Sequence, residues 1–258
     1  MKILFLDIDG TVLSHTTNSI PPSALNAINE ARRKGVKVFG CTGRHTEELK
    51  KLPLDELYVD GWITMNGALN YVGDEVVSEY PIEREDISIL YQGIQQHSFP
   101  VQFLEKDEMY MNMYSKAVIE GLKNIHSEPD PIKPLERILE NKIYMFIPWI
   151  TSDIFDPIQE RMIHTKGVRW NEYAVDCFHK ECGKRYGIED ILAYFNISKE
   201  DAGCVGDADN DLSMLEGCTH SVAMGNACDR LKEKADYVCR HIDNHGLQDA
   251  IEYLMNLA

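Results

Sequence analysis

Near its start the sequence reads KILFLDIDGT, at Lys2–Thr11. It contains an unbroken apolar run from Ile3 to Leu6, which is typical of a strand buried on both faces in a parallel sheet. Two carboxylates, Asp7 and Asp9, follow at the end of this strand, and alternate positions lie on the same side of an extended chain. In open α/β sheets the carboxyl ends of the strands form the ligand crevice. Two acids in one crevice repel each other, so the stretch predicts a bound cation or a shared proton.

A helix from about Pro22 to Gly35 and a second buried strand at 36–41 follow, and this strand runs into Thr-Gly-Arg. Since parallel strands share their carboxyl end, Thr42 is expected at the same sheet edge as the first two acids. A hydroxyl beside a small residue with an accessible amide, here Gly43, suits a phosphate oxygen, although Thr42 equally fits a helix N-cap. Two neighbouring side chains are candidates for substrate contacts: Arg44 and His45.

The third strand is expected at 62–64, and the segment Asn66-Gly67-Ala68 leads from it into a β-hairpin at 69–80. The next site candidate is Lys184, so only the gap between them is long enough to hold a second domain. We place this domain at about 81–178 and expect an antiparallel sheet with helices on one face. The expected strands are 101–104, 109–113, 143–147 and 168–170, and the expected helices are 85–97 and a helix capped at 151–153 that runs to about 164.

A further buried strand at 202–205 runs into the acidic segment Gly206-Asp207-Ala208-Asp209-Asn210-Asp211, and a helical pattern follows. Acids are normal at a helix N-terminus, but this segment has more of them than a cap requires. A calcium-binding EF-hand is excluded because its glycine and its downstream glutamate are absent at the required offsets. The acids therefore point to a site at the sheet edge.

Composition restricts the possible partners. The net charge of −16 opposes binding to nucleic acid and to anionic membrane surfaces. No apolar run is long enough to cross a membrane, and the first strand follows Met1 and Lys2 at once, so we expect no signal peptide. Seven scattered cysteines favour reduced thiols in a cytoplasmic protein. A zinc site at Cys177, His179 and Cys182 is disfavoured, because a fourth ligand at suitable spacing is missing.

These motifs resemble the phosphatase branch of the haloacid dehalogenase-like (HAD) hydrolases, in which a hydrophobic strand runs into Asp-x-Asp-Gly-Thr. Asn66-Gly67-Ala68 and the segment 222–227 are similar to the Cof-type subgroup. The resemblance implies a doubly wound, mostly parallel, Rossmann-like α/β core at 1–80 and 179–258. It also implies that the α+β insert at 81–178 is a cap, which in this family closes over the active site and selects the substrate.

The resemblance also implies roles for individual residues. Asp7 would be the nucleophile and Asp9 the general acid/base. Thr42 and the backbone amides of Ile8 and Gly43 would bind the phosphoryl group. Mg²⁺ would be bound by Asp7, Asp207 and the backbone oxygen of Asp9. Asn210 would lie near the substrate phosphate, and Asp211 would be a supporting acid.

The family places a lysine at the start of the helix after the cap, where it points into the crevice. Counting back from the strand at 202–205 favours Lys184 over Lys180 for this role. The chain departs from the family here, because a small residue usually follows this lysine and Arg185 stands in its place.

The predicted function is Mg²⁺-dependent hydrolysis of a small phosphate monoester, for example a sugar phosphate, through an aspartyl phosphate. One alternative is a phosphomutase of the same superfamily, which would yield an isomerised sugar phosphate in place of free phosphate. The other is a non-enzymatic phospho-acceptor domain, against which Asp9 and the large insert argue. The sequence carries no motif for the substrate in the insert and does not indicate an oligomeric state.

Overall fold

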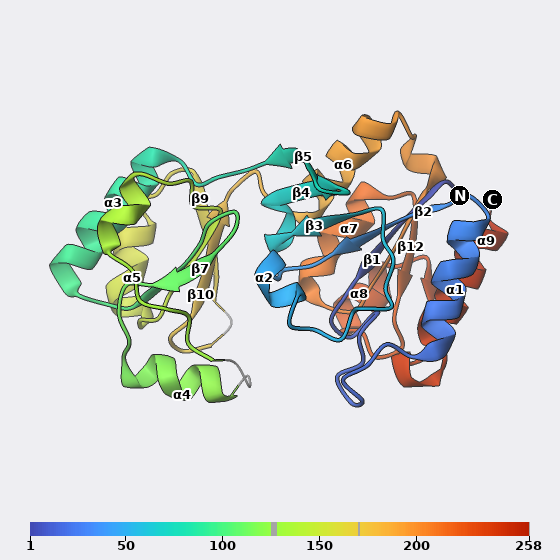
Figure 1. Ribbon diagram of the computed structural model, residues 1–258, viewed down its shortest axis with the longest axis horizontal. Helices are drawn as coiled ribbons and strands as arrows, with labels where there is room; N and C mark the ends of the chain where they lie inside the picture. Colours follow the sequence, from blue (N-terminus) through green and yellow to red (C-terminus); the bar gives the residue numbers. More distant parts are fainter. Residues whose placement is uncertain (125–127, 170, 258) are drawn as a thin grey trace. The chain divides into compact units, whose positions relative to one another are not determined.

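The computed structural model describes residues 1–124, 128–169 and 171–257 (Figure 1). The chain divides into two compact units. The core unit is Met1–Glu79 with Gly183–Ala258, and the inserted unit is Tyr80–Cys182. Tyr80 and residues 179–182, which were expected in the core, therefore lie with the inserted unit. Within the described ranges, no helix has the length and apolar character needed to span a bilayer.

The central strand of the core unit is β1 (Ile3–Asp7), in which every residue is buried. Its alternating side chains enter two separate hydrophobic layers, one on each face of the sheet. The prediction of a strand buried on both faces is confirmed. One layer holds Leu4 and Leu6 with α1 (Pro22–Arg33) and α9 (Gly246–Asn256), and the other holds Ile3 and Phe5 with α6 (Lys184–Phe195).

The core sheet has eight strands in the order β13-β12-β11-β1-β2-β3-β4-β5. All neighbours are parallel except the β3–β4 and β4–β5 pairs. The chain moves outward from β1 on one side and later returns on its other side, so the strand order reverses between β1 and β11. Such a reversal opens a crevice at the carboxyl ends of these two strands. The other elements of this unit are β2 (Lys37–Cys41), α2 (Thr46–Leu49), β3 (Gly61–Thr64), η1 (Met65–Gly67), β4 (Leu69–Val72), β5 (Glu75–Glu79), η3 (Lys199–Asp201), β11 (Ala202–Gly206), η4 (Asp209–Asp211), α7 (Leu212–Gly217), β12 (His220–Ala223), α8 (Asp229–Lys234), β13 (Tyr237–Val238) and η5 (Ile242–Asn244).

The inserted unit is built on an antiparallel sheet of five strands in the order β7-β6-β8-β10-β9. Helices α3 and α5 pack against one face through a cluster that includes Leu90, Phe103, Phe146 and Phe155. The bounds are α3 (Arg84–His97), β6 (Val101–Leu104), β7 (Met109–Met111), α4 (Lys116–Asn124), η2 (Leu135–Leu139), β8 (Met145–Pro148), α5 (Ser152–Gln159), β9 (Thr165–Arg169) and β10 (Val175–His179).

Several expectations for this unit need correction. Helix α4 packs against the opposite face of the sheet, where Val118 and Leu122 contact Met111 and Trp149, so helices do not lie on one face alone. Helix α5 ends at Gln159 and not near 164, and no cap side chain bonds its first turn. Strand β10 was not predicted. Trp170, expected at the end of a strand, lies outside the described residues.

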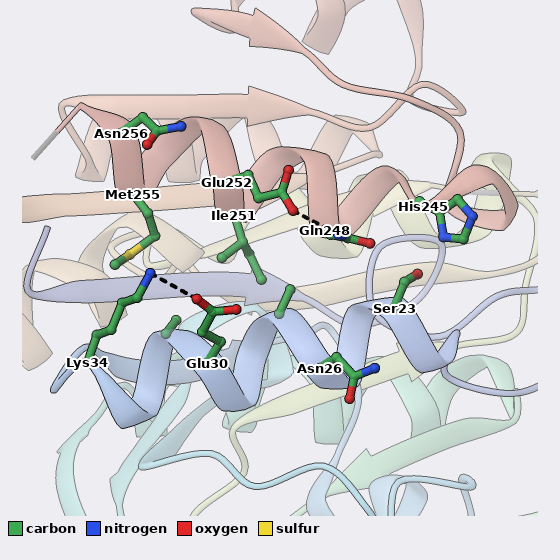
Figure 2. A pocket seen from close by; sticks show the side chains of 12 residues that line it. Ser23, Asn26, Glu30, Lys34, His245, Gln248, Ile251, Glu252, Met255 and Asn256 are labelled. Carbon is green, nitrogen blue, oxygen red and sulfur yellow. Dashed lines mark hydrogen bonds and ion pairs between the residues drawn. The ribbon is translucent and has the colours of Figure 1, made fainter.

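Helices α1 and α9 lie side by side on one face of the core sheet (Figure 1). A groove of about 380 Å³ runs between them, with Ala27, Ala31 and Ile251 among its lining residues (Figure 2). Two charged side chains along it, Glu30 and Lys34, pair with each other at 3.0 Å. The acids that the sequence singled out are not among the residues that line this groove, so the candidate site lies elsewhere.

Candidate active site

The strand order of the core sheet brings the predicted acids together. Asp7 is the last residue of β1, and Asp207 directly follows the neighbouring parallel strand β11. Asp211 stands at the end of η4, and its side chain is fully buried. Carboxylate oxygens of Asp7, Asp207 and Asp211 all lie within 4.8 Å of one another. In the part of the chain that the structure describes, this is the only such group of three or more potential metal ligands. Cys177, His179 and Cys182 therefore do not form a group of this kind there.

Lys184 supplies the positive charge of this cluster. It is the first residue of α6, and its side chain is completely buried. Its Nζ donates to Asp7 Oδ1 at 2.7 Å and to Asp211 Oδ1 at 2.5 Å. Lys180, the other candidate, is exposed and belongs to the inserted unit. The structure therefore brings Lys184 to the predicted acids, although Arg185 follows it.

One ammonium faces three carboxylates, and the pKa values reflect this imbalance. Burial, followed by the nearby Asp211, raises the pKa of Asp7 well above its usual value, against the opposing effect of Lys184. Burial and Asp211 also raise the pKa of Asp207 to about 6. Burial alone would lower the pKa of Lys184, but Asp211 and Asp7 outweigh it and raise the pKa. The cluster thus contains more negative charge than its own residues neutralise.

The loop that carries Asp207 is fixed from two sides. Asp211 Oδ2 accepts hydrogen bonds from the backbone amides of Asp207 and Ala208, at 2.9 and 3.0 Å. Thr11 Oγ1 donates to Asp207 Oδ1 at 3.1 Å. Gly10 has a φ of +82°, and a Cβ at this position would lie 2.2 Å from Asp207 Oδ2, so only glycine allows the two segments to approach this closely. The Gly-Thr of the first motif therefore serves to place Asp207.

Asp9 has a partner that the sequence did not predict. Arg44 Nε donates to Asp9 Oδ2 at 2.7 Å, and Arg44 Nη2 donates to Asp9 Oδ1 at 2.8 Å. This bidentate pairing fixes the plane of the carboxylate. Hydrogen bonding to Asp9 raises the pKa of Arg44. Sequence reasoning placed Arg44 near the crevice as a substrate contact, and the structure shows that it orients the Asp9 side chain.

The remaining predicted residues lie around the same sheet edge. Thr42 is buried, and its Oγ1 accepts a hydrogen bond from the Arg44 amide at 3.1 Å. Asn210 is exposed and donates from Nδ2 to Asn66 Oδ1 at 3.2 Å. The Asn66 backbone amide donates to the Thr42 carbonyl at 3.0 Å, and a Cβ added to Gly43 would lie 3.2 Å from the Asn66 side-chain amide. Asn66 thus connects the strand ends after β2 and β11, a role that its sequence context did not reveal.

Two further side chains lie outside the cluster. His45 is buried, and its side chain accepts a hydrogen bond from the Glu47 amide as the N-cap of α2, so its visible role is structural. Asp209 is exposed and pairs with Arg230 at 3.2 Å, as expected for an acid that points away from the site.

A family model described as haloacid dehalogenase-like hydrolase matches residues 4–251. The chain belongs to the haloacid dehalogenase-like hydrolases. The putative phosphatase YkrA of Bacillus subtilis (strain 168) is 29% identical, over 98% of this chain and 97% of YkrA. Phosphoglycolate phosphatase 1 of Saccharolobus solfataricus is 25% identical, over 99% of this chain and 96% of that protein.

Solved structures of this HAD family agree with the fold. The structure described as the HAD subclass IIB sugar phosphatase BT4131 is 31% identical, with a TM-score of 0.84 over 99% of both chains. A protein from Geobacillus kaustophilus HTA426 is 26% identical, with a TM-score of 0.90 over 98% of both chains. The predicted membership in the Cof-type HAD phosphatases, with an α/β core and an inserted cap, is confirmed. The chain is an enzyme, a HAD-type phosphoric monoester hydrolase.

Proposed function

We propose that this enzyme hydrolyses small phosphate monoesters in a Mg²⁺-dependent reaction that passes through an aspartyl phosphate on Asp7. The observation that carries the proposal is the hydrogen bonding of the buried Asp7 carboxylate. Its Oδ1 accepts a hydrogen bond from Lys184 at 2.7 Å, while Oδ2 has no hydrogen-bond partner among the described residues. A nucleophile needs a fixed orientation and an oxygen that is not engaged in a hydrogen bond, and these two observations support that role for Asp7.

The donor set around Asp7 fits a hard divalent cation. Asp7, Asp207 and Asp211 present clustered carboxylate oxygens, and Asp7 Oδ2 is buried without a partner. Carboxylates, backbone oxygens and waters are the ligands that Mg²⁺ prefers. Asp7, Asp207 and the backbone oxygen of Asp9 would hold the ion. When bound, Mg²⁺ lowers the repulsion between the Asp7 carboxylate and a phosphate dianion.

The proposed reaction has two chemical steps. In the first, a carboxylate oxygen of Asp7 attacks phosphorus, the bond to the ester oxygen breaks, and Asp9 gives that oxygen its proton. In the second, Asp9 takes a proton from water as the water attacks phosphorus, and Asp7 and free phosphate are released. Lys184, the Thr42 hydroxyl and the amides of Ile8 and Gly43 would bind the phosphoryl oxygens, with Asn210 near the substrate phosphate.

The Asp9–Arg44 pair adds a condition to this scheme. Both carboxylate oxygens of Asp9 are bound by Arg44. Each of these oxygens keeps a further lone pair, so Asp9 must transfer the proton through the lone pairs that Arg44 leaves open. We therefore assign Arg44 the role of holding Asp9 in one orientation between the two proton transfers.

The substrate class is proposed from the relatives. BT4131 is described as a sugar phosphatase, and phosphoglycolate phosphatase 1 is named for another small phosphate monoester. The direct test is phosphate release from a panel of sugar phosphates and other small monoesters, with Mg²⁺ and after its removal by chelation. We expect free phosphate only with the metal. Isomerised sugar phosphate as the sole product, or equal rates after chelation, would contradict the proposal.

A further inference from the structure

The proposed metal ligands come from two segments that are far apart in the sequence, the turn after β1 and the loop after β11. Both segments carry negative charge, so they repel each other when no cation lies between them. Some part of the protein must hold them at the spacing that a cation requires. Thr11 provides one such contact through its bond to Asp207.

A third segment contacts both. Asn226 lies in the turn after β12, and its Nδ2 donates to the Gly10 carbonyl at 2.8 Å. The same amide nitrogen lies 3.5 Å from Asp207 Oδ2. On its other side, Asn226 Oδ1 accepts a hydrogen bond from the Ile242 amide at 3.0 Å. One side chain therefore contacts the first acidic turn, the second acidic loop and η5.

The turn around Asn226 is itself anchored to the same neighbours. The Cys228 amide donates to the Asp207 carbonyl at 2.8 Å, and the Met224 amide donates to the Gly206 carbonyl at 3.0 Å. The Gly225 amide donates to the Arg240 carbonyl at 3.0 Å. Asn226 is thus presented from a backbone that is tied to the Asp207 loop on one side and to the segment before η5 on the other.

We propose that Asn226 is a positioning residue for the metal site, which sets the distance between the Gly10 turn and Asp207 before the cation binds. This inference rests on the proposed Mg²⁺-dependent function. The chemistry requires an amide, because the position needs a donor toward two oxygens and an acceptor toward the Ile242 N–H. A carboxylate would lack the donor and would add a fourth negative charge to the cluster.

Groups that orient metal ligands typically change metal affinity by about 10- to 100-fold when they are removed. We expect Asn226→Ala to weaken Mg²⁺ binding by about tenfold, at the low end of this range, because Thr11 still holds Asp207. Since Asn226 does not touch the reacting atoms in this scheme, kcat at saturating Mg²⁺ should stay close to that of the wild type. The Mg²⁺ concentration for half-maximal activity should rise with the dissociation constant.

The experiment titrates Mg²⁺ into metal-depleted protein by calorimetry and measures phosphate release against Mg²⁺ concentration. The variants are Asn226→Ala and, as a matched control, Asn244→Ala, which truncates an exposed asparagine in η5. Asn226→Ser keeps a polar atom in the turn and provides a milder truncation if the alanine variant does not fold. It should change affinity in the same direction by a smaller amount.

The outcomes separate this inference from the proposed function. Weaker Mg²⁺ binding in the Asn226 variants, with kcat and the control unchanged, supports the positioning role. Wild-type affinity in folded Asn226→Ala, or a loss of kcat that saturating Mg²⁺ does not restore, overturns the positioning role and leaves the proposed function in place. Failure of the wild-type protein to bind Mg²⁺ overturns both.

Discussion

The two units of this enzyme treat buried carboxylates in opposite ways. In the inserted unit, Glu105 has a side chain only 9% exposed, and Arg137 binds both of its oxygens at 2.7 Å. Asn141 adds hydrogen bonds at 3.1 and 3.0 Å. Burial would raise the pKa of Glu105, but these partners outweigh it and lower the pKa. In the core unit, burial and the neighbouring Asp211 raise the pKa of Asp7 and Asp207, and the single Lys184 does not offset them.

The difference separates a structural network from a site prepared for chemistry. The charges of the Glu105 network are matched within the protein and need nothing from solution. The Asp7 cluster is incomplete, and the missing positive charge is what a bound cation would supply. Uncompensated acids in a crevice are a recurring mark of functional sites.

Asp7→Asn removes the proposed nucleophile while keeping the shape of the side chain. We expect phosphate release at saturating substrate and Mg²⁺ to fall by about 10⁴-fold or more, because no acyl phosphate can form in the usual way. Thermal unfolding should show a folded protein. The matched change in the inserted unit is Glu105→Gln, which should keep turnover and lose stability. Near-normal turnover in Asp7→Asn would remove Asp7 from its assigned role.

Arg44→Ala should lower kcat/KM by about 100-fold, because a misplaced acid/base group loses the alignment that proton transfer requires. Arg44→Lys should recover only part of this loss, since an ammonium cannot reproduce the planar, bidentate contact with Asp9. Steady-state kinetics on the best substrate measures both. If the alanine variant matched the wild type, Arg44 would be an ion pair without a part in catalysis.

Arg137→Met should destabilise the protein by about 2 kcal/mol, because Glu105 would remain buried after losing a bidentate, charged partner. Chemical denaturation with a probe for the inserted unit gives the free energy of unfolding. The double variant Arg137→Met with Glu105→Gln should recover part of the loss. A stability unchanged by Arg137→Met would mean that the network is not the structural element described above.

Asp207→Asn should stabilise the metal-free protein. The pKa of Asp207 is raised to about 6 in the folded state, whereas the pKa of an aspartate in the unfolded chain is about 4. The folded protein therefore holds this proton to higher pH, and its unfolding free energy falls as pH rises from about 4 to about 6. Asparagine does not titrate, so the unfolding free energy of the variant should exceed that of the wild type by about 2 kcal/mol at neutral pH. Chemical denaturation in the presence of chelator across this pH range gives both unfolding free energies. A difference between them that does not change with pH would be inconsistent with a raised pKa of Asp207.

Much of the core could be predicted from the sequence because its information is local. The apolar run at β1, the acids at strand ends and the glycine and asparagine turns each mark their own position, and the parallel order then brings Asp7 and Asp207 together. Lys184 could be found by counting from β11. The pairing of Arg44 with Asp9 and the contacts of Asn226 could not, since both depend on which loops meet in three dimensions.

The inserted unit was less predictable for a different reason. Strand β10 is short and mixes polar and apolar residues, so Cys177 and His179 drew attention as possible ligands and not as members of a strand. Two apolar residues of helix α4, Val118 and Leu122, form a core only by packing against Trp149. The interior Pro157 gave no clear sign of where α5 ends. Tertiary packing decided these elements, and local propensity did not.

The completion of the core cluster by a cation is tested by the thermal unfolding temperature of the wild-type protein and of Asp207→Asn, measured at neutral pH with and without Mg²⁺. If the core cluster is completed by a cation, Mg²⁺ will raise the unfolding temperature of the wild type, because a ligand that binds only the folded state stabilises it. The rise will be much smaller in Asp207→Asn, which lacks one proposed ligand. An unfolding temperature of the wild type that does not respond to Mg²⁺, or an equal rise in both proteins, would contradict the account.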